Sequence, residues 1–238
     1  LLLHNDAISI VTPTPSHFEL AAMAIKQNKH VFIEKPATSD PEDTQKLIKL
    51  AREAGVCVQV GHVERFNPAF TAVKDHINTP VFFEIQRLAT YNVRGTDVSV
   101  VLDLMIHDID LVLSTVKSKI KKISATGSFM ISETPDFANA RLEFENGCVA
   151  NITANRAAVC NKREITVFQK NACITIDLLH KKAAINYIEP VSGEKDSNGS
   201  QLNIKSLNPE IKAVNSIKQE LEDFYNSINQ KLAVKVSL

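Results

Sequence analysis

The chain has 238 residues, 44% of them hydrophobic, and its 27 basic and 27 acidic residues give a formal net charge of zero. This length allows one large or two smaller domains with a substantial core, and the balanced charge gives no sign of a nucleic-acid-binding surface. No apolar run is long enough to span a bilayer. We therefore expect no membrane partner. The cysteines lie too far apart for a metal site, so we expect no metal. In a chain of this size we expect reduced, mostly buried thiols of a cytoplasmic protein. They are Cys57, Cys148, Cys160 and Cys173.

The first 61 residues alternate between strand and helix patterns. Strands are predicted over 7–15, where prolines stop the run, over 30–33 and over 56–61, with helices over 16–29 and 41–55 between them. Short strands joined by helices predict right-handed crossovers and a parallel sheet.

The predicted helices carry end signals. Ser16 and Glu19 are placed as a capping box at the start of the first helix. Asp40 before Pro41 is typical of an N-cap, and Gly55 stands where a helix ends.

After Gly61 the pattern changes to one long apolar helix, 98–116, among many strands. The pair Asn146-Gly147 predicts a two-residue hairpin turn. A polar stretch, 190–210, predicts a loop, and a final helix is expected to bury one apolar face, formed by Ile217, Leu221, Phe224 and Ile228. The predicted strands are 80–90 and runs near 121–130, 138–145, 147–155, 163–169 and 172–178.

These elements predict an α/β protein. We expect residues 1–61 to form the C-terminal half of a Rossmann-type parallel sheet. Residues 62–238 are expected to form an α+β domain, with a mostly antiparallel open sheet, that binds substrate and forms oligomers. Three parallel strands are an incomplete doubly wound sheet and no GxGxxG occurs in the sequence, so we expect the chain to be a fragment.

A polar stripe interrupts the apolar helix over 98–116. Its members are spaced by 4, 4, 3 and 4 residues, which places them on one helical face; they are Ser99, Asp103, His107, Asp110 and Ser114. A row of polar groups on a buried helix suggests a polar cavity. The alternative is a solvated face on which His107 pairs with the carboxylate one turn back.

Polar loops follow each of the three parallel strands. The second strand ends in Glu34-Lys35-Pro36, where Pro36 restricts the backbone of Lys35 to extended geometry. Such loops converge on one crevice in a parallel sheet. A lysine there and a histidine braced by a carboxylate are suitable for proton transfer from a hydroxyl group. A surface ion pair between Glu34 and Lys35 is the alternative.

The order of these motifs resembles the Gfo/Idh/MocA family of NAD(P)-dependent oxidoreductases. The resemblance runs across nearly the whole chain, through AISIVTPTPSHFELAAMAI, KHVFIEKP, VGHVERFNPAF and DLMIHDID. The form GHVERFNPA is similar to the subgroup that contains UDP-N-acetylglucosamine 3-dehydrogenases. The chain departs from the family by lacking the GxGxxG unit, and two missing strand–helix units would add roughly 60–80 residues.

The resemblance implies roles for particular residues. It implies that Lys35, His107 and Asp103 are catalytic, with Asp103 also holding the sugar. Thr12, Pro13, His17, Glu34 and Lys35 are implied to bind the cofactor, NAD or NADP. Substrate contacts are implied for Arg65, Asn67, Asp103, His107 and Arg156.

We therefore expect a dehydrogenase that oxidises a secondary alcohol of a sugar or nucleotide sugar, with His107 or, in the alternative, Lys35 as the proton acceptor. The 238 residues alone are expected to be inactive. A homo-oligomer, dimer or tetramer, is expected through the open sheet face. The competing hypothesis is a non-catalytic sugar-binding or regulatory protein that uses the same crevice.

Overall fold

The computed structural model describes residues 4–92, 98–190 and 202–238, which form two compact units. The first unit comprises Leu1–Phe66 and Val214–Leu238, and the second comprises Asn67–Ala213. The sequence placed all of 62–238 in one domain, whereas by contacts its C-terminal segment groups with the first unit. The backbone N–H of Val60 donates to the carbonyl of Val236, and the rings of Phe32 and Phe224 pack with their centroids 5.9 Å apart.

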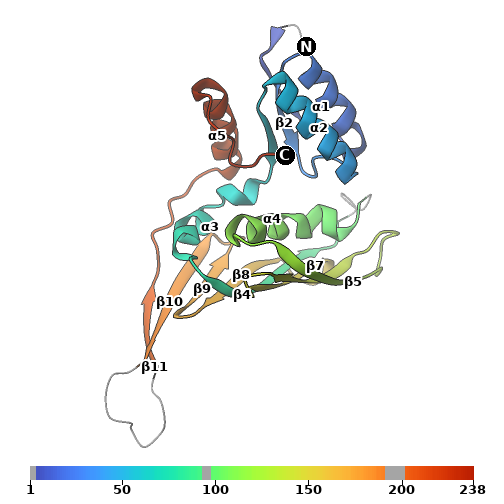
Figure 1. The fold of residues 1–238 in the computed structure, drawn as a ribbon. Coiled ribbons are helices and arrows are strands. Elements are labelled where there is room, and N and C mark those ends of the chain that lie inside the picture. The colour runs from blue at the N-terminus through green and yellow to red at the C-terminus, as the bar shows by residue number, and fades with distance from the viewer. Residues whose placement is uncertain (1–3, 93–97, 191–201) are drawn as a thin grey trace, which may run out of the picture. The chain divides into compact units, whose positions relative to one another are not determined.

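The first unit contains the predicted parallel sheet, in the order β1-β2-β3. Its strands are β1 (Ala7–Ile10), β2 (His30–Glu34) and β3 (Val58–Gly61), and α1 (His17–Lys26) and α2 (Pro41–Ala54) connect them (Figure 1). Apolar side chains of strands and helices form its core, among them Ile25, Val31, Ile33, Leu47 and Val58.

The ends of α2 are as predicted, and the start of α1 is not. The Asp40 side chain accepts from the Glu42 N–H at 2.8 Å, and Gly55 ends the helix with φ of 65°. The capping box was wrong, because a 3₁₀ turn over Thr14–Ser16 already gives Ser16 helical dihedral angles. Its hydroxyl instead donates into the preceding loop.

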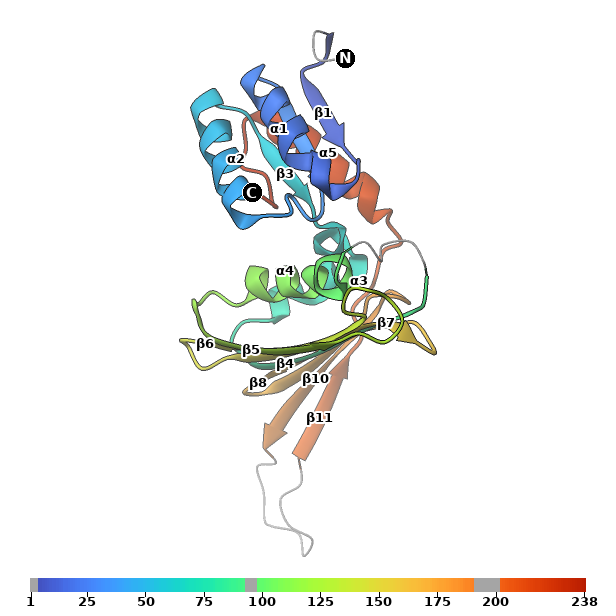
Figure 2. The same cartoon turned by 90° about the vertical axis from the view of Figure 1, so that its right-hand side faces the viewer.

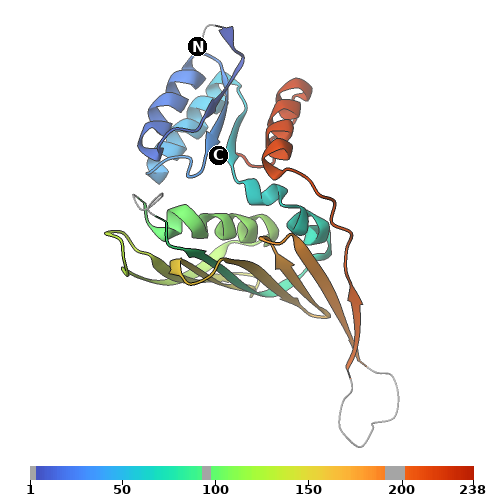
Figure 3. The ribbon, with the colours of Figure 1, turned by 180° about the vertical axis from the view of Figure 1, so that it is seen from behind.

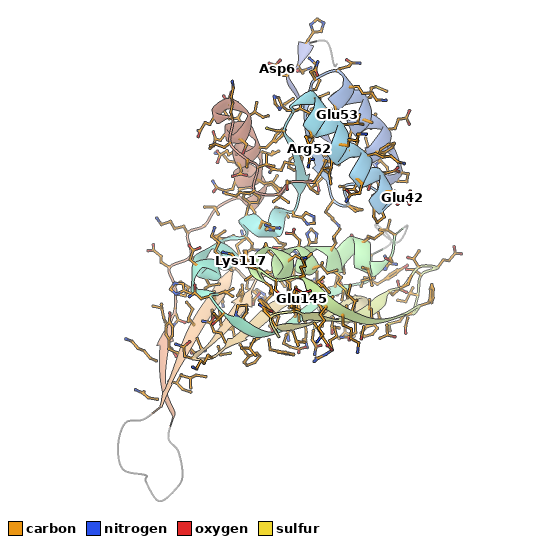
Figure 4. The ribbon with its side chains drawn as sticks, in the orientation of Figure 1. Asp6, Glu42, Arg52, Glu53, Lys117 and Glu145 are labelled. Atoms are coloured by element: carbon orange, nitrogen blue, oxygen red, sulfur yellow. The ribbon has the colours of Figure 1, made fainter. Side chains whose placement is uncertain are left out.

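Polar side chains cover the outer surface of α2. The buried face of α5 (Ser216–Gln230) holds both polar and apolar residues. Figure 4 shows Glu42, Arg52 and Glu53 projecting from α2. The predicted apolar face of α5 is only partly buried. Phe224 is buried, whereas Ile217 and Leu221 are 61% and 42% exposed. The buried residues of α5 are Glu220, Phe224 and Ser227.

The second unit contains a mostly antiparallel sheet of eight strands, in the order β11-β10-β9-β8-β4-β7-β6-β5, in which β4 and β7 run parallel. The strands expected from the sequence are β4 (Pro80–Thr90), β5 (Ile120–Ser128), β6 (Phe137–Phe144), β7 (Val149–Ala158), β8 (Lys162–Gln169) and β9 (Ala172–Asp177). Two strands were missed, β10 (Lys182–Pro190) and β11 (Leu202–Leu207), and β11 lies within the predicted loop. Residues 191–201 of that loop are outside the described residues, and 208–210 are described without regular secondary structure.

Helices α3 (Pro68–Val73) and α4 (Ile106–Thr115) pack on one face of this sheet (Figure 2). In Figure 3 the other face carries no helix of the described part of the unit. Outward positions there include polar side chains, such as Asn139, whose amide donates to Thr153 at 2.9 Å. The predicted open face is therefore present.

The helix expected over 98–116 begins with a wide turn. Val101–Met105 form a π-helical turn that leads directly into α4, and no side chain caps its start. Such turns are rare and frequently occur at functional sites.

The hairpin between β6 and β7 is present with a different turn. The Gly147 N–H donates to the carbonyl of Phe144 at 3.0 Å, so Glu145 and Asn146 form the centre of the turn and Gly147 follows with φ of 86°. Figure 4 labels Glu145 in this turn.

All four cysteines are free thiols. Cys148 is buried, Cys57 and Cys173 are half-buried, and Cys160 is exposed, so the prediction of mostly buried thiols was only partly correct. Burial raises the pKa of Cys148 to about 11. None of the helices in the described segments is long and apolar enough to cross a membrane.

Candidate active site

Loops follow the carboxyl ends of β1 and β2, and a buried histidine joins them. His17, the first residue of α1, is 1% exposed. Its Nδ1 lies 2.9 Å from the carbonyl of Pro36, and its Nε2 lies 2.8 Å from the carbonyl of Thr12. The ring thus ties the loop with the exposed Thr12 and Pro13 to the loop with Lys35.

The end of β2 presents the predicted carboxylate and ammonium groups, both half-buried. The Glu34 carboxylate turns back to accept from the backbone N–H of Lys35 at 3.3 Å. It lies against β3, where a Cβ atom on Gly61 would come within 2.9 Å of its Oε2. Gly61 therefore leaves the space that the carboxylate of Glu34 occupies, and that carboxylate holds the backbone of Lys35.

The loop after β3 contains Arg65 and Asn67, two of the predicted substrate contacts. Arg65 is half-buried in a 3₁₀ turn over Val63–Phe66. Asn67 is 6% exposed: its oxygen accepts from the Ala69 N–H and caps α3, while its amide donates to the carbonyl of Leu178. Asn67 thus has a structural contact, and its contact with substrate stays a prediction.

The polar stripe begins at Ser99, just before the π-helical turn, and runs along that turn and α4. Asp103 is in the π-helical turn and His107 is the second residue of α4, and all five members of the stripe are half-buried. The hydroxyl of Ser114 donates to the carbonyl of Leu111 in its own helix, so this member is satisfied locally.

A buried ion pair beside His107 was missed by the sequence analysis. Asp108, 1% exposed, accepts two hydrogen bonds of 2.8 Å from the guanidinium of Arg87, which is 2% exposed. The available signal was the alternation in β4, where Phe83, Ile85 and Arg87 all occupy inward positions. An inward arginine requires a buried acceptor.

A second buried cluster surrounds Arg156, which was predicted to contact substrate. Arg156 is 4% exposed; its Nε donates to Asp136 at 2.8 Å and its Nη1 to the carbonyl of Val98 at 2.7 Å. The other oxygen of Asp136 accepts the backbone N–H groups of residues 130–132. Burial by itself raises the pKa of Asp136, but these N–H groups and Arg156 outweigh it and hold the pKa well below its usual value.

A polar cavity of about 310 Å³ in the second unit brings Asp103 and Arg156 together. Amide, phenol, carboxylate and guanidinium groups line the cavity. Such a lining suits a ligand with several hydroxyl or amide groups. Its walls are formed by Ala89, Thr90, Tyr91, Asn92, Asp103, Leu104, Arg156 and Asn161. Tyr91, Asn92 and Asn161 were not identified from the sequence, because they meet only when the ends of β4 and β7 lie side by side.

The structure divides the predicted residues between the two units. The first unit holds Thr12, Pro13, His17, Glu34, Lys35 and Arg65, and the second holds Asn67, Asp103, His107 and Arg156. In the first unit these groups occupy the edge at which ligands bind in parallel sheets. In the second, Asp103 and Arg156 line the cavity, His107 lies one turn after Asp103, and Asn67 lies apart at the start of α3.

Comparison with known proteins identifies both halves of the chain. Residues 2–62 match a family described as "Oxidoreductase family, NAD-binding Rossmann fold", and residues 70–175 match the "GFO/IDH/MocA C-terminal domain". The UDP-N-acetylglucosamine 3-dehydrogenase of Acidithiobacillus ferrooxidans is 31% identical over 234 residues, which are 96% of this chain and 72% of that protein.

Solved structures and more distant relatives agree with this assignment. A structure of the Acidithiobacillus ferrooxidans enzyme superimposes with a TM-score of 0.89 at 30% identity, covering 99% of this chain and 74% of the other. A scyllo-inositol 2-dehydrogenase (NAD(+)) of Bacillus subtilis is 27% identical over 168 residues, 64% of this chain, and the chain spans about half of that protein (49%).

Proposed function

The chain belongs to the GFO/IDH/MocA family of oxidoreductases with an NAD-binding Rossmann fold, and from this premise we propose that it transfers a hydride between NAD and a secondary alcohol of a nucleotide sugar. The observation that carries the proposal is the polar cavity at Asp103, one turn before His107, in a chain that is similar over 96% of its length to a UDP-N-acetylglucosamine dehydrogenase.

The second unit supplies the groups that would handle the substrate. We propose that His107 accepts the proton of the reacting hydroxyl, a role worth about 10²–10⁴ in rate. Asp103 would hold the sugar by accepting hydrogen bonds from its hydroxyl groups. From one helical turn away, it would also orient the imidazole of His107. Arg65 is proposed as a further contact with the substrate.

The first unit supplies a cation and the cofactor loops. The ammonium of Lys35, on a backbone held by Glu34, would stabilise the alkoxide that forms as the hydroxyl loses its proton. The alternative assignment, with Lys35 as the proton acceptor, uses the same two groups in exchanged roles.

The residues at the edge of the three-stranded sheet fit the nicotinamide half of the cofactor. Thr12 and Pro13 are exposed there, His17 fixes their loop to that of Lys35, and Gly61 makes room for the Glu34 carboxylate. When bound, nicotinamide supplies the hydride acceptor, and the protein orients it. The 238 residues contain no GxGxxG for the pyrophosphate.

We also propose that the open face of the eight-stranded sheet joins copies of this chain into a dimer or tetramer. A sheet face without covering helices in the described unit favours such a contact. A cytoplasmic location is proposed with it, on the support of four free thiols.

Steady-state kinetics with UDP-N-acetylglucosamine and NAD test the proposed function in the full-length protein. We expect His107→Asn to lower kcat by about 10² or more without weakening NADH binding. Lys35→Met should also lower kcat, and Asp103→Ala should raise KM and lower kcat.

Melting temperatures of the same variants provide the control. A folded His107→Asn protein with unchanged kcat would remove His107 as the base and leave Lys35 in that role. A wild-type protein that binds the nucleotide sugar but reduces no NAD would instead support the competing hypothesis of a non-catalytic binding protein.

A further inference from the structure

We propose that Asp136, Arg156 and Thr134 are positioning residues that fix the π-helical turn carrying Asp103, an inference that rests on the proposed function for its catalytic meaning. Asp136 is fully buried, and none of the three was expected from the sequence to hold a helix. The start of this helix has no side-chain cap, and the cluster instead holds the backbone that leads into it.

Hydrogen bonds from this cluster converge on the backbone just before the turn. The carbonyl of Val98 accepts from Arg156 Nη1 at 2.7 Å and from the hydroxyl of Thr134 at 3.1 Å. Two residues later, the Val100 N–H donates to the carbonyl of Pro135 at 2.9 Å. The backbone is thus held on both sides of Ser99, whose own carbonyl accepts from the N–H of Asp103 at 3.0 Å.

The loop that provides these partners is itself held by the buried carboxylate. Asp136 Oδ2 accepts from the N–H groups of Met130, Ile131 and Ser132 at 2.9, 2.6 and 2.8 Å. Its Oδ1 accepts from Arg156, and Arg156 also donates to the carbonyl and hydroxyl oxygens of Thr134. The loop and β7 therefore form one hydrogen-bonded frame around the helix start.

This frame bears on the cavity because Asp103 and Arg156 both line it. A π-helical turn is less stable than an α-helical one, so its geometry depends on contacts outside the helix. A loosened frame would let the carboxylate of Asp103 leave the position in which it meets the substrate, since small displacements of a positioning group have large effects on binding and rate.

Thr134→Val is the variant that tests the inference, with Thr115→Val as its matched control. Valine keeps the shape of threonine and removes the hydroxyl that bonds Val98 and Arg156. Thr115 lies at the other end of the same helix, where its hydroxyl donates to the carbonyl of Leu111 at 2.7 Å. Both variants lose one hydroxyl-to-carbonyl bond, and Thr134→Val also loses the bond that Arg156 donates to the hydroxyl. Melting temperatures of both variants measure the general loss of stability.

Amide hydrogen exchange of residues 98–105, measured on residues 1–238, is the first readout. We expect exchange in this segment to be about threefold to tenfold faster in Thr134→Val, which loses the hydrogen bond to Val98, and unchanged in Thr115→Val. Asp136→Asn should give a larger increase if it folds. Equal exchange in the two threonine variants would overturn the inference.

Kinetics of the full-length protein with UDP-N-acetylglucosamine form the second readout. Thr134→Val should raise KM by a factor of about three to ten, leaving NADH binding and the Thr115→Val control near wild type. An unchanged KM would refute the catalytic meaning of the cluster. If the wild-type protein itself turns over no nucleotide sugar, the proposed function fails, while the exchange experiment still decides whether the cluster fixes Asp103.

Discussion

In the described part of the second unit, the charged side chains that are almost fully buried occur as partners of opposite sign. Arg87 with Asp108 and Arg156 with Asp136 are each between 0% and 4% exposed. A buried charge is costly unless it is paired and hydrogen-bonded. These residues therefore mark the places where the backbone around the candidate site is held.

In the first unit, His30 illustrates how a single residue can make stability depend on pH. Its Nδ1 accepts from the backbone N–H of Cys57 at 2.9 Å, a bond that requires an unprotonated nitrogen. Burial lowers the pKa of His30 below its ordinary value, and the nearby Asp6 acts weakly in the opposite direction. Because the unfolded chain then binds the proton more readily, the contribution of this residue to stability falls as the pH decreases through the ordinary pKa.

We expect the wild-type chain to lose more unfolding free energy between pH 7.5 and pH 5.5 than His30→Asn. The asparagine Oδ1 can replace Nδ1 as the acceptor for Cys57, and it does not titrate. Urea denaturation of both proteins at the two pH values measures the difference. An equal loss in both proteins would show that His30 contributes nothing to the pH dependence.

At the scale of elements, the helix that carries the stripe is attached to the sheet at two points. Its start is bound to the loop after β5 and to β7 through Val98 and Val100. Its middle is bound to β4 through the two hydrogen bonds between Asp108 and Arg87. His107 adjoins the second point, so its backbone position follows from the strand below.

Asp108→Asn should destabilise the second unit strongly, because it leaves the guanidinium of Arg87 buried without a counter-charge. Removing one partner of a buried pair costs about 3–5 kcal/mol. The control is Glu143→Gln, which breaks the exposed pair with Arg141 and should cost less than about 1 kcal/mol. Urea denaturation compares the two, and similar costs would contradict the importance assigned to the buried pair.

At the scale of the whole molecule, the chain contains a first unit with a three-stranded parallel sheet and a second unit with an eight-stranded sheet. The C-terminal segment returns to the first unit, where Phe224 packs on Phe32 of β2. The described part of the first unit has three strands, and the 238 residues contain no GxGxxG turn.

We therefore expect residues 1–238 alone to bind NADH negligibly and to turn over nothing, because the backbone N–H groups of that turn hold the pyrophosphate. Fluorescence titration with NADH measures this, with the full-length protein as the reference. Micromolar binding by residues 1–238 would mean that the loops at Thr12 and Lys35 hold the cofactor without the turn.

Local signals made much of the fold predictable. Asp40, Pro41 and Gly55 each act within one helix, so their patterns identified both ends of α2. The alternating strands of the second unit were found for the same reason. Strand β11 was missed because it is short, lies in a polar, turn-rich stretch and leaves its apolar residues Ile204 and Leu207 exposed, so that its backbone pairing with β10 is what makes it a strand.

The sequence by itself determined the parallel strands, the polar loops after them and the helical spacing of Asp103 and His107, because each depends on residues close together in the chain. Only the tertiary structure decided that Arg87 meets Asp108, that Arg156 meets Asp136, and that Tyr91 and Asn161 share a cavity with Asp103. The two ion pairs join residues 21 and 20 positions apart, and the cavity joins residues of three different segments. Their partners are chosen by the order of strands in the sheet, which the pattern of any single segment does not encode.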